Sequence, residues 1–358
     1  MLSTLTYAQF NEDNLIKLAV SNVTKGPAAQ IGIRLNQGAE VYFQKVNHQN
    51  ELPGYRIEMT HRNDSYEPFN TLKNTQYFLQ QGDFFAFFNY VGTPTTAAIL
   101  ETIKNNKLPF LTPFTGAYFL RKPAIKNIFT LRASYYQEVK AQLDYLINTR
   151  GFKNIGLLIQ ADDFGYAVEK GYKKIMESYH VTPTITARYR RNTEDIQTAL
   201  MLLRKHKVEA VAFVGTYKPL STLINQAYEQ DFTPFFSSVS FISSADLFPL
   251  LKYHSDVLIT EVFPDPKDCK KAYCRQFVED MNAAGYSDLD RIQLEGYMNG
   301  YLFTQVAKQC INTMTPTCFL NEIQNFSSQQ LDIKIEFSPL EHQGLNNVYL
   351  NIYSPVRQ

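Results

Sequence analysis

Short apolar runs alternate along most of the chain with segments of helical periodicity. The apolar runs have the length of buried strands and lie at residues 16–20, 55–59, 84–91, 109–112, 155–159, 184–189, 210–214 and 234–237. Between them, apolar residues recur every three or four positions, which predicts helices at residues 31–46, 68–81, 95–105, 137–149, 167–179, 193–205 and 220–229. A repeated strand–helix order is typical of parallel sheets with helices on both faces, so we predict an α/β fold.

Length and charge narrow the class of protein further. With 358 residues the chain is too long for one ordinary core and fits two lobes of roughly 150 residues each. The formal net charge is +1 and the basic residues are scattered, which argues against a nucleic-acid partner. No run of about 18 apolar residues predicts a membrane span. Residues 1–9 lack the features of a full secretory signal, and fit either a truncated signal ending near Ala8 or a disordered start.

The cysteines bear on the cellular compartment. All four fall in the last third of the chain, without the spacing of zinc ligands, so we expect no metal or other cofactor. An even number in one region suits two disulfide bonds in an oxidising compartment. The simplest pairing is Cys269–Cys274 and Cys310–Cys318, and four buried free thiols in a cytosolic protein remain the alternative.

Motifs of the common enzyme classes are missing from the sequence. It has no nucleophile elbow, phosphate-binding loop, dinucleotide fingerprint or zinc-protease motif. The adjacent acids Asp162 and Asp163 could form an acid–base pair, although turn and helix-cap chemistry is more ordinary for them. The six histidines fall in loops or at helix ends, where we expect surface residues: His48, His61, His180, His206, His254 and His342. We therefore expect a binding protein and no enzyme.

The loops that follow the strands carry the informative residues, because ligands of parallel sheets bind beyond the carboxyl ends of the strands. In order and spacing, short motifs over some three hundred residues resemble the branched-chain amino-acid-binding family of type I periplasmic binding proteins. These motifs are Gly26-Pro27, Gly38-Ala39-Glu40, Asp64-Ser65-Tyr66 with Pro68, Gly92-Thr93-Pro94-Thr95, Thr112-Pro113-Phe114-Thr115, Phe129-Thr130-Leu131-Arg132, Asp163-Phe164-Gly165, Glu295-Gly296-Tyr297, His342-Gln343 and Val348-Tyr349-Leu350.

This resemblance implies two Rossmann-like lobes with parallel sheets, joined by three hinge crossings. The crossings are expected near residues 131–133, 260–262 and 335–337. Lobe one would comprise residues 12–131 plus 262–335, and lobe two would comprise residues 132–261 plus 336–358. All four cysteines would then lie in lobe one.

The resemblance also implies a ligand site between the lobes. Thr93, with Thr95 beside it, would bind a carboxylate at a helix N-terminus, whose free N–H groups favour an anion; both threonines could instead be helix caps. Phe114 and Thr115 match a segment that binds an amino group, and could equally form an ordinary turn. Tyr217 would cover the ligand from lobe two, or else pack on its own helix. The acid–aromatic–glycine loop adds two further candidates, Asp163 and Phe164.

Two departures from the family pattern affect the ligand. The acid that usually pairs with an α-ammonium group is replaced by Ser240, which is itself a candidate ligand contact. An aromatic residue of the first helix is replaced by Ile31. Because an unpaired ammonium is expensive to bury, either Asp162 or Asp163 compensates or the ligand is not an α-amino acid. Amides, urea-like molecules and aromatic carboxylates are also bound within this superfamily.

The function implied by the resemblance is that of a periplasmic, monomeric solute-binding component of an ABC importer, with a small polar ligand and a membrane permease as its partners. Two alternatives share the fold. They are a cytoplasmic sensor that controls transcription antitermination and the extracellular sensing domain of a receptor.

Overall fold

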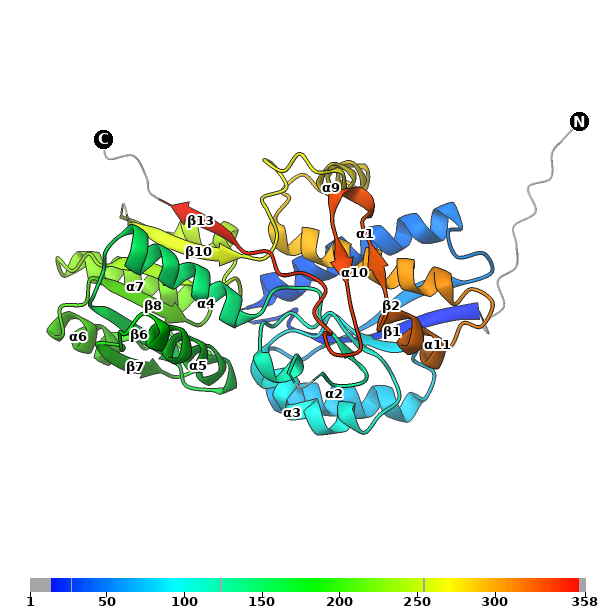
Figure 1. Cartoon of the computed structure of the whole chain (residues 1–358), viewed down its shortest axis with the longest axis horizontal. Helices are drawn as coiled ribbons and strands as arrows, with labels where there is room; N and C mark the ends of the chain where they lie inside the picture. Colours follow the sequence, from blue (N-terminus) through cyan, green and yellow to red (C-terminus); the bar gives the residue numbers. More distant parts are fainter. Residues whose placement is uncertain (1–13, 27, 123, 254, 354–358) are drawn as a thin grey trace, which may run out of the picture.

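The computed structural model describes residues 14–26, 28–122, 124–253 and 255–353. The proposed signal remnant ending near Ala8 and residue His254 lie outside these ranges. Within them, the chain forms two α/β bodies that lie side by side along the long axis of the molecule (Figure 1). We call them lobe one and lobe two. No helix in the described ranges is long and apolar enough to cross a bilayer.

Lobe one contains a parallel five-stranded sheet in the order β2-β1-β3-β4-β5. Its strands are β1 (Leu15–Asn22), β2 (Arg56–Asn63), β3 (Ala86–Phe88), β4 (Phe110–Leu111) and β5 (Ile128–Phe129). Its helices are α1 (Ala29–Gln49), α2 (Pro68–Gln81), α3 (Thr93–Lys104), η2 (Tyr118–Leu120), α9 (Ala272–Ala283), α10 (Arg291–Gln309), α11 (Pro316–Ile323) and η5 (Gln330–Asp332). A small antiparallel pair, β11 (Ser327–Ser328) and β12 (Ile335–Glu336), lies beside it.

Lobe two contains a six-stranded sheet in the order β13-β10-β9-β8-β6-β7, parallel except for its antiparallel edge strand β13. Its strands are β6 (Ile155–Gln160), β7 (Ile185–Tyr189), β8 (Ala210–Val214), β9 (Phe235–Ser238), β10 (Val257–Glu261) and β13 (Tyr349–Tyr353). Its helices are α4 (Tyr135–Leu143), η3 (Asp144–Thr149), α5 (Asp163–Ser178), α6 (Gln197–Lys205), α7 (Tyr217–Glu229), α8 (Ser244–Leu247) and η4 (Phe248–Leu250).

The inner strands are mostly apolar because both faces of each sheet are covered, whereas the edge strands β2 and β13 are only partly buried. In β1, Leu18 and Val20 point to the core that contains α1 and α10, while Ala19 points to the core that contains α2 and α3. In β8, Ala212 and Phe213 are divided between two cores in the same way. This alternation follows from the two-residue period of a strand and confirms the predicted two-sided arrangement.

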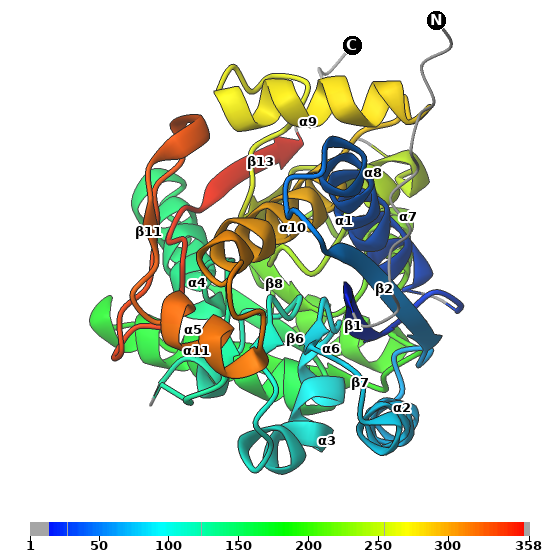
Figure 2. The same cartoon turned by 90° about the vertical axis from the view of Figure 1, so that its right-hand side faces the viewer.

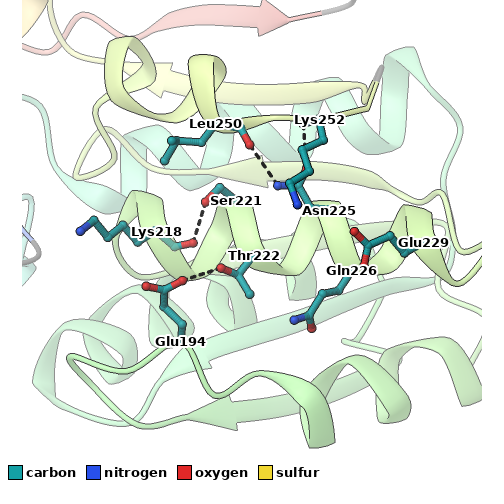
Figure 3. Close-up of a pocket in the computed structure, with 9 residues that line it drawn as sticks. All are labelled: Glu194, Lys218, Ser221, Thr222, Asn225, Gln226, Glu229, Leu250 and Lys252. Carbon is teal, nitrogen blue, oxygen red and sulfur yellow. Dashed lines mark hydrogen bonds between the residues drawn. The ribbon is translucent and has the colours of Figure 1, made fainter.

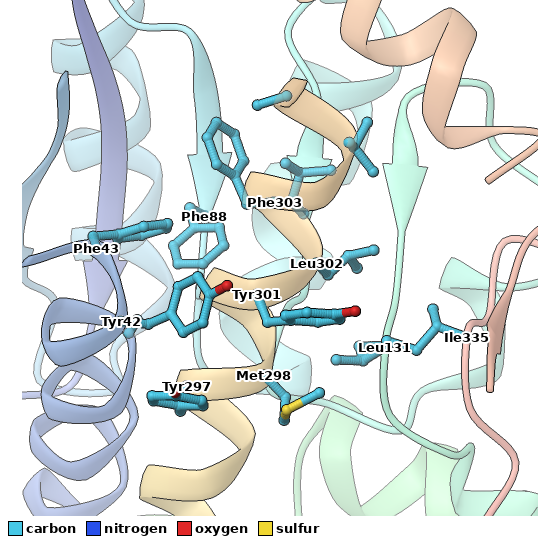
Figure 4. Packing of buried hydrophobic residues seen from close by; sticks show 14 of the residues in the cluster. Tyr42, Phe43, Phe88, Leu131, Tyr297, Met298, Tyr301, Leu302, Phe303 and Ile335 are labelled. Carbon is cyan, nitrogen blue, oxygen red and sulfur yellow. The ribbon is translucent and has the colours of Figure 1, made fainter. Parts of the chain in front are cut away.

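Helices α1 and α10 are distant in sequence and lie against each other in both views of the molecule (Figures 1 and 2). Glycine permits this close approach. A Cβ atom on Gly38 would lie 1.8 Å from the carbonyl oxygen of Gln293, and one on Gly296 would lie 2.0 Å from that of Leu35. The rings of Tyr42 and Tyr297 meet edge to face beside this crossing, with centroids 4.8 Å apart (Figure 4).

The chain passes between the lobes three times: between β5 and α4, after β10, and between β12 and β13. The observed elements differ from the predicted ones mainly at their ends. Strand β3 is shorter than the apolar run at residues 84–91 because Asn89 adopts a left-handed conformation, with φ of 52°. Helix α7 begins at Tyr217, three residues before the predicted helix at residues 220–229, since Pro219 is tolerated in a first helical turn.

The expectation that the histidines are surface residues is wrong for His342. Its ring is 3% exposed and stacks on Phe129, with centroids 4.0 Å apart, because the third crossing runs beside β5. Both disulfide bonds of the simplest pairing, Cys269–Cys274 and Cys310–Cys318, are present.

Candidate functional site

A group of buried side chains from both lobes lies where the carboxyl ends of the two sheets face each other. We call it the interlobe cluster; it consists of Tyr66, Thr93, Phe114 and Thr115 from lobe one, Arg132 from the first crossing, and Tyr135, Phe164, Ser240 and Phe241 from lobe two.

Tyr66 is directed into the cluster by a turn after β2. Ser65 and Tyr66 both have positive φ, of 54° and 62°, a conformation that is unfavourable for residues with a Cβ atom. The buried carboxylate of Asp64 stabilises the turn by accepting hydrogen bonds from the N–H of Tyr66 and the hydroxyl of Thr71, both at 2.9 Å. Burial raises the pKa of Asp64 to about 6. The ring then fills the space beside Gly92, where a Cβ atom would lie 2.4 Å from Tyr66 Cε2.

Two threonines on neighbouring loops of lobe one meet at the cluster. The hydroxyl groups of Thr93 and Thr115 are 2.7 Å apart and fully buried, so one donates to the other. Thr95 uses its hydroxyl differently, donating to the backbone oxygens of Val91 and Gly92 at the start of α3. The structure therefore brings Thr93 and Thr115 together as candidate ligand contacts, while the hydroxyl of Thr95 is engaged by its own helix.

The lobe-two side of the cluster is built on helix starts. Ser134 and Gln137 form a capping box for α4, and the N–H of Tyr135 donates to the carbonyl of Gly116 in lobe one at 2.8 Å. The rings of Tyr135 and Phe164 lie 5.4 Å apart. Burial raises the pKa of Tyr135, which keeps the phenol protonated and able to donate.

The ring of Phe241, from lobe two, contacts aromatic rings of both lobes. Its centroid lies 4.7 Å from that of Phe164, 5.5 Å from that of Tyr66 and 5.9 Å from that of Phe114. The guanidinium carbon of Arg132 lies 4.0 Å from the centre of the Phe114 ring, in cation–π contact. An aromatic wall and a buried cation thus adjoin each other.

Ser240 lies in the loop after β9, where the family resemblance predicts an acid. Its N–H and hydroxyl donate to the carboxylate of Glu138 at 2.7 and 2.9 Å, and its hydroxyl accepts a hydrogen bond from Arg132. Glu295 lies 3.6 Å from Nε of Arg132, and burial raises the pKa of Glu295 to about 7. The cationic side chain of Arg132, bonded to Ser240 and close to the buried acids Glu138 and Glu295, therefore lies beside Ser240.

Arg121 secures the first and third crossings beneath the cluster. Its guanidinium donates to the carbonyls of Thr115 and Arg132, both at 3.1 Å, and to the side-chain oxygen of Gln343 at 2.7 Å. Burial lowers the pKa of Arg121 to about 9. These bonds connect the loop that carries Thr115 to two crossings, so they position the candidate ligand contacts relative to the hinge.

Several polar atoms of the cluster are buried without a hydrogen-bond partner. They are the phenol oxygens of Tyr66 and Tyr135 and the Nε and Nη1 atoms of Arg132. All three side chains are 1% exposed. Since an unpaired buried polar group is costly, native structures rarely leave such atoms unsatisfied except where a ligand or water binds. The cluster therefore offers unsatisfied polar atoms from both lobes, as a ligand site would.

Two further predicted residues lie outside the cluster. Asp163 is exposed at the first turn of α5. Tyr217 is half-buried at the start of α7 and packs against the lobe-two core of α6 and α7. Burial is the main reason that its pKa is raised, followed by the nearby charge of Asp246.

The rim around the cluster carries direct contacts between the lobes. Arg34 of α1 donates to Asp246 of α8 at 3.1 Å. Arg191, after β7, donates to Glu67 at 2.6 Å and to the carbonyl of Tyr66 at 3.0 Å. The stacked rings of Tyr118 and Tyr136 add a further contact, with centroids 4.8 Å apart. The lobes are therefore closed on each other in this structure.

A hollow lies on the surface of lobe two, over α7 (Figure 3). Several of its polar side chains already pair with one another or with nearby backbone: Thr222 donates to Glu194 at 2.6 Å, and Asn225 donates to the carbonyl of Leu250 at 3.0 Å. It lacks the unsatisfied atoms of the interlobe cluster and is the weaker candidate. No three His, Cys, Asp or Glu side chains in the described ranges are grouped to hold a metal ion.

Four residues of the interlobe cluster were not predicted from the sequence: Tyr66, Arg132, Tyr135 and Phe241. Signals for two of them were present. Tyr66 lies in the aspartate-containing segment after the second strand, and Arg132 ends the motif that marks the first crossing. Both were read as marks of the fold and not as ligand contacts. Nothing in the sequence marks the convergence of Tyr135 and Phe241, which depends on how the lobes close.

A family model extends over almost the whole chain, whereas the chain spans less than two thirds of the length of the curated relatives it matches. A family model described as periplasmic binding protein matches residues 15–351. A Leu/Ile/Val-binding protein homolog 3 of Brucella melitensis is 18% identical over 214 residues, 60% of this chain and 58% of that relative. The crystal structure of a possible leucine/isoleucine/valine-binding protein from Rhodopirellula baltica superposes with a TM-score of 0.89 at 26% identity and covers 96% of both chains.

A third similar protein was solved with a ligand. It is a solute-binding protein of an ABC transporter from R. palustris in complex with benzoate, with a TM-score of 0.83 and 17% identity, covering 95% of this chain and 94% of that one. At such low identity the likeness concerns the fold.

Proposed function

Because this chain belongs to the periplasmic binding protein family, we propose that it is the extracytoplasmic solute-binding component of an ABC importer. In this proposal, a small organic ligand enters between the lobes, the lobes close on it by bending at the three crossings, and the closed protein delivers it to a membrane permease. The protein acts as a monomer and performs no catalysis.

The observation that carries the proposal is the interlobe cluster itself. Its unsatisfied phenol and guanidinium atoms come from lobe one, lobe two and the first crossing, so a ligand bound there would contact both lobes. A ligand that binds only when both lobes contact it shifts the equilibrium toward the closed state. The lobe limits near residues 131, 262 and 335 belong to the same proposal, as does the ligand-contact role of Thr93 and Thr115.

The disulfide bonds support a compartment outside the cytoplasm. Such bonds persist in oxidising compartments and are rare in the cytosol. Both lie among the helices and loops of lobe one, remote from the cluster, and they favour the importer component over a cytoplasmic sensor of the same fold.

A ligand screen tests this proposal. Purified protein is heated in the presence of amino acids, aliphatic and aromatic carboxylates, amides and ureas, because a ligand that binds only the folded state raises the melting temperature. Hits are then followed by small-angle scattering. We expect at least one hit and, if the free protein is open, a smaller radius of gyration on binding. If no solute raises the melting temperature, the proposed function is wrong.

A further inference from the structure

The hydrogen-bonding capacity left in the interlobe cluster is mainly that of a donor site. Arg132 can only donate, through Nη1 and through Nε, which lies 3.6 Å from Glu295. The phenols of Tyr66 and Tyr135 can donate or accept. A ligand that satisfies the guanidinium must therefore present acceptors. A carboxylate presents two oxygens with several lone pairs and matches a guanidinium especially well.

Two acids around the cluster, Asp162 and Glu138, already accept several hydrogen bonds from the chain itself. The carboxylate of Asp162 accepts from the N–H groups of Phe164 and Gly165, at 3.1 and 3.2 Å, and from the amide of Gln160 at 2.7 Å. Its second oxygen also faces Arg191 at 3.8 Å. Asp162 is thus the cap of α5, so it does not compensate for the missing acid.

Glu138 is engaged in the same way. It accepts from the N–H and hydroxyl of Ser240 and, at 2.9 Å, from the hydroxyl of Thr260. Glu295 is paired with Arg132, its oxygen lying 3.6 Å from Nε. An α-ammonium group placed here would lose its hydration next to a guanidinium and would compete with that guanidinium for Glu295, which is unfavourable.

The rest of the cluster is apolar. Phe114, Phe164 and Phe241 are each at most 1% exposed, and their rings are in mutual contact across the lobes. Such a wall suits a hydrocarbon body, flat or branched, and offers nothing to a second charged group.

We propose that the ligand of the interlobe cluster is a small apolar carboxylate that carries no α-ammonium group. This inference rests on the proposed function. It assigns Tyr66, Tyr135 and Arg132 as the donors to the ligand's carboxylate. Ser240, which replaces the family's usual acid, accepts a hydrogen bond from Arg132 and so positions it.

Two pairs of compounds that differ only in the ammonium group provide the test. 4-Methylpentanoate is leucine without its amino group, and 3-phenylpropanoate is phenylalanine without it. Calorimetry at neutral pH should show at least one of these acids binding at least tenfold more tightly than its amino-acid partner. Equal or tighter binding of the amino acids overturns the inference and leaves the proposed function intact. So does the absence of binding by both acids when other solutes in the screen bind.

Variants lacking one phenol separate a ligand contact from a structural role. Because the oxygens of Tyr66 and Tyr135 make no hydrogen bond of normal length in this structure, Tyr66→Phe and Tyr135→Phe should change the melting temperature of the free protein little. They should weaken binding of the preferred acid about fivefold or more.

Tyr90→Phe is the matched control, because the Tyr90 hydroxyl lies 3.2 Å from that of Thr75 in lobe one, outside the cluster. It should lower the melting temperature and leave affinity unchanged. Unchanged affinity in both cluster variants overturns the assignment of the phenols.

Discussion

Replacing Asp246 by Asn tests whether the contact across the rim contributes to closure. Arg34 of lobe one bonds two carboxylates at once: Asp246 of lobe two at 3.1 Å and Asp290 of its own lobe at 2.6 Å. The side chains of Arg34 and Asp246 are 15% and 14% exposed, so this pair lies between a surface ion pair and a fully buried one. Exposed pairs contribute up to about 1 kcal/mol, and loss of one partner of a buried pair costs about 3–5 kcal/mol.

We therefore expect Asp246→Asn to destabilise the closed state by about 1–2 kcal/mol, since Arg34 keeps its bond to Asp290. If ligand binding requires closure, the dissociation constant should rise by about 5- to 30-fold. Isothermal titration calorimetry with a ligand found in the screen measures the dissociation constant, and stopped-flow fluorescence should place most of the change in the dissociation rate.

Asp290→Asn is the control because it disturbs the same arginine within one lobe. Asp290 also caps α10, accepting from the N–H of Gln293 at 2.9 Å, so this variant should lower the free energy of unfolding with a smaller effect on affinity. If Asp246→Asn changed the dissociation constant by less than twofold, the contact would not contribute to closure. The same conclusion would follow if both variants weakened binding equally.

Four further outcomes are expected. Thr93→Val should weaken binding by about 1–3 kcal/mol in calorimetry, because it removes a buried hydroxyl from the cluster. Ser240→Ala should lower the free energy of unfolding in urea by about 1–3 kcal/mol, since two buried charged groups each lose a partner. Reducing the two disulfide bonds should lower it by about 2–3 kcal/mol each, from the chain entropy of short loops. Burial raises the pKa of Glu295 from 4.5 to about 7, so its contribution to stability is fully present below pH 4.5 and is lost as the pH rises toward 7. Glu295→Gln should therefore make the free energy of unfolding depend less on pH between 4.5 and 7.

The sequence was sufficient to predict the alternation of strands and helices because the relevant signal is local. Apolar runs and helical periodicity depend on neighbouring residues, and the cores of both sheets confirm them. The predicted ends were less accurate where a single backbone conformation decides the outcome. Asn89 ends β3 by adopting a left-handed conformation, and periodicity does not report on that.

The candidate site was predicted only in part because its geometry is non-local. Thr93 and Thr115 could be selected from their loops, and they do meet. The partner of Ser240 is Arg132, more than a hundred residues away, and the two approach each other only through the fold of the first crossing. The cap chemistry favoured for Asp162 is confirmed, because its carboxylate accepts from the first N–H groups of α5. Its further bond from the amide of Gln160 depends on the fold and could not be predicted.

The close crossing of α1 and α10 fixes an order in which the molecule can assemble during synthesis. The apolar face of α1, which includes Leu35, Tyr42 and Val46, is covered by a helix that begins at Arg291. Lobe two, from α4 to β10, is contiguous and lacks only its edge strand when the ribosome has passed Glu261. Lobe one, whose strands are made first, thus receives the helix that covers α1 only after most of lobe two has been made. Its exposed helix face must be kept from aggregating until about 250 further residues have been made.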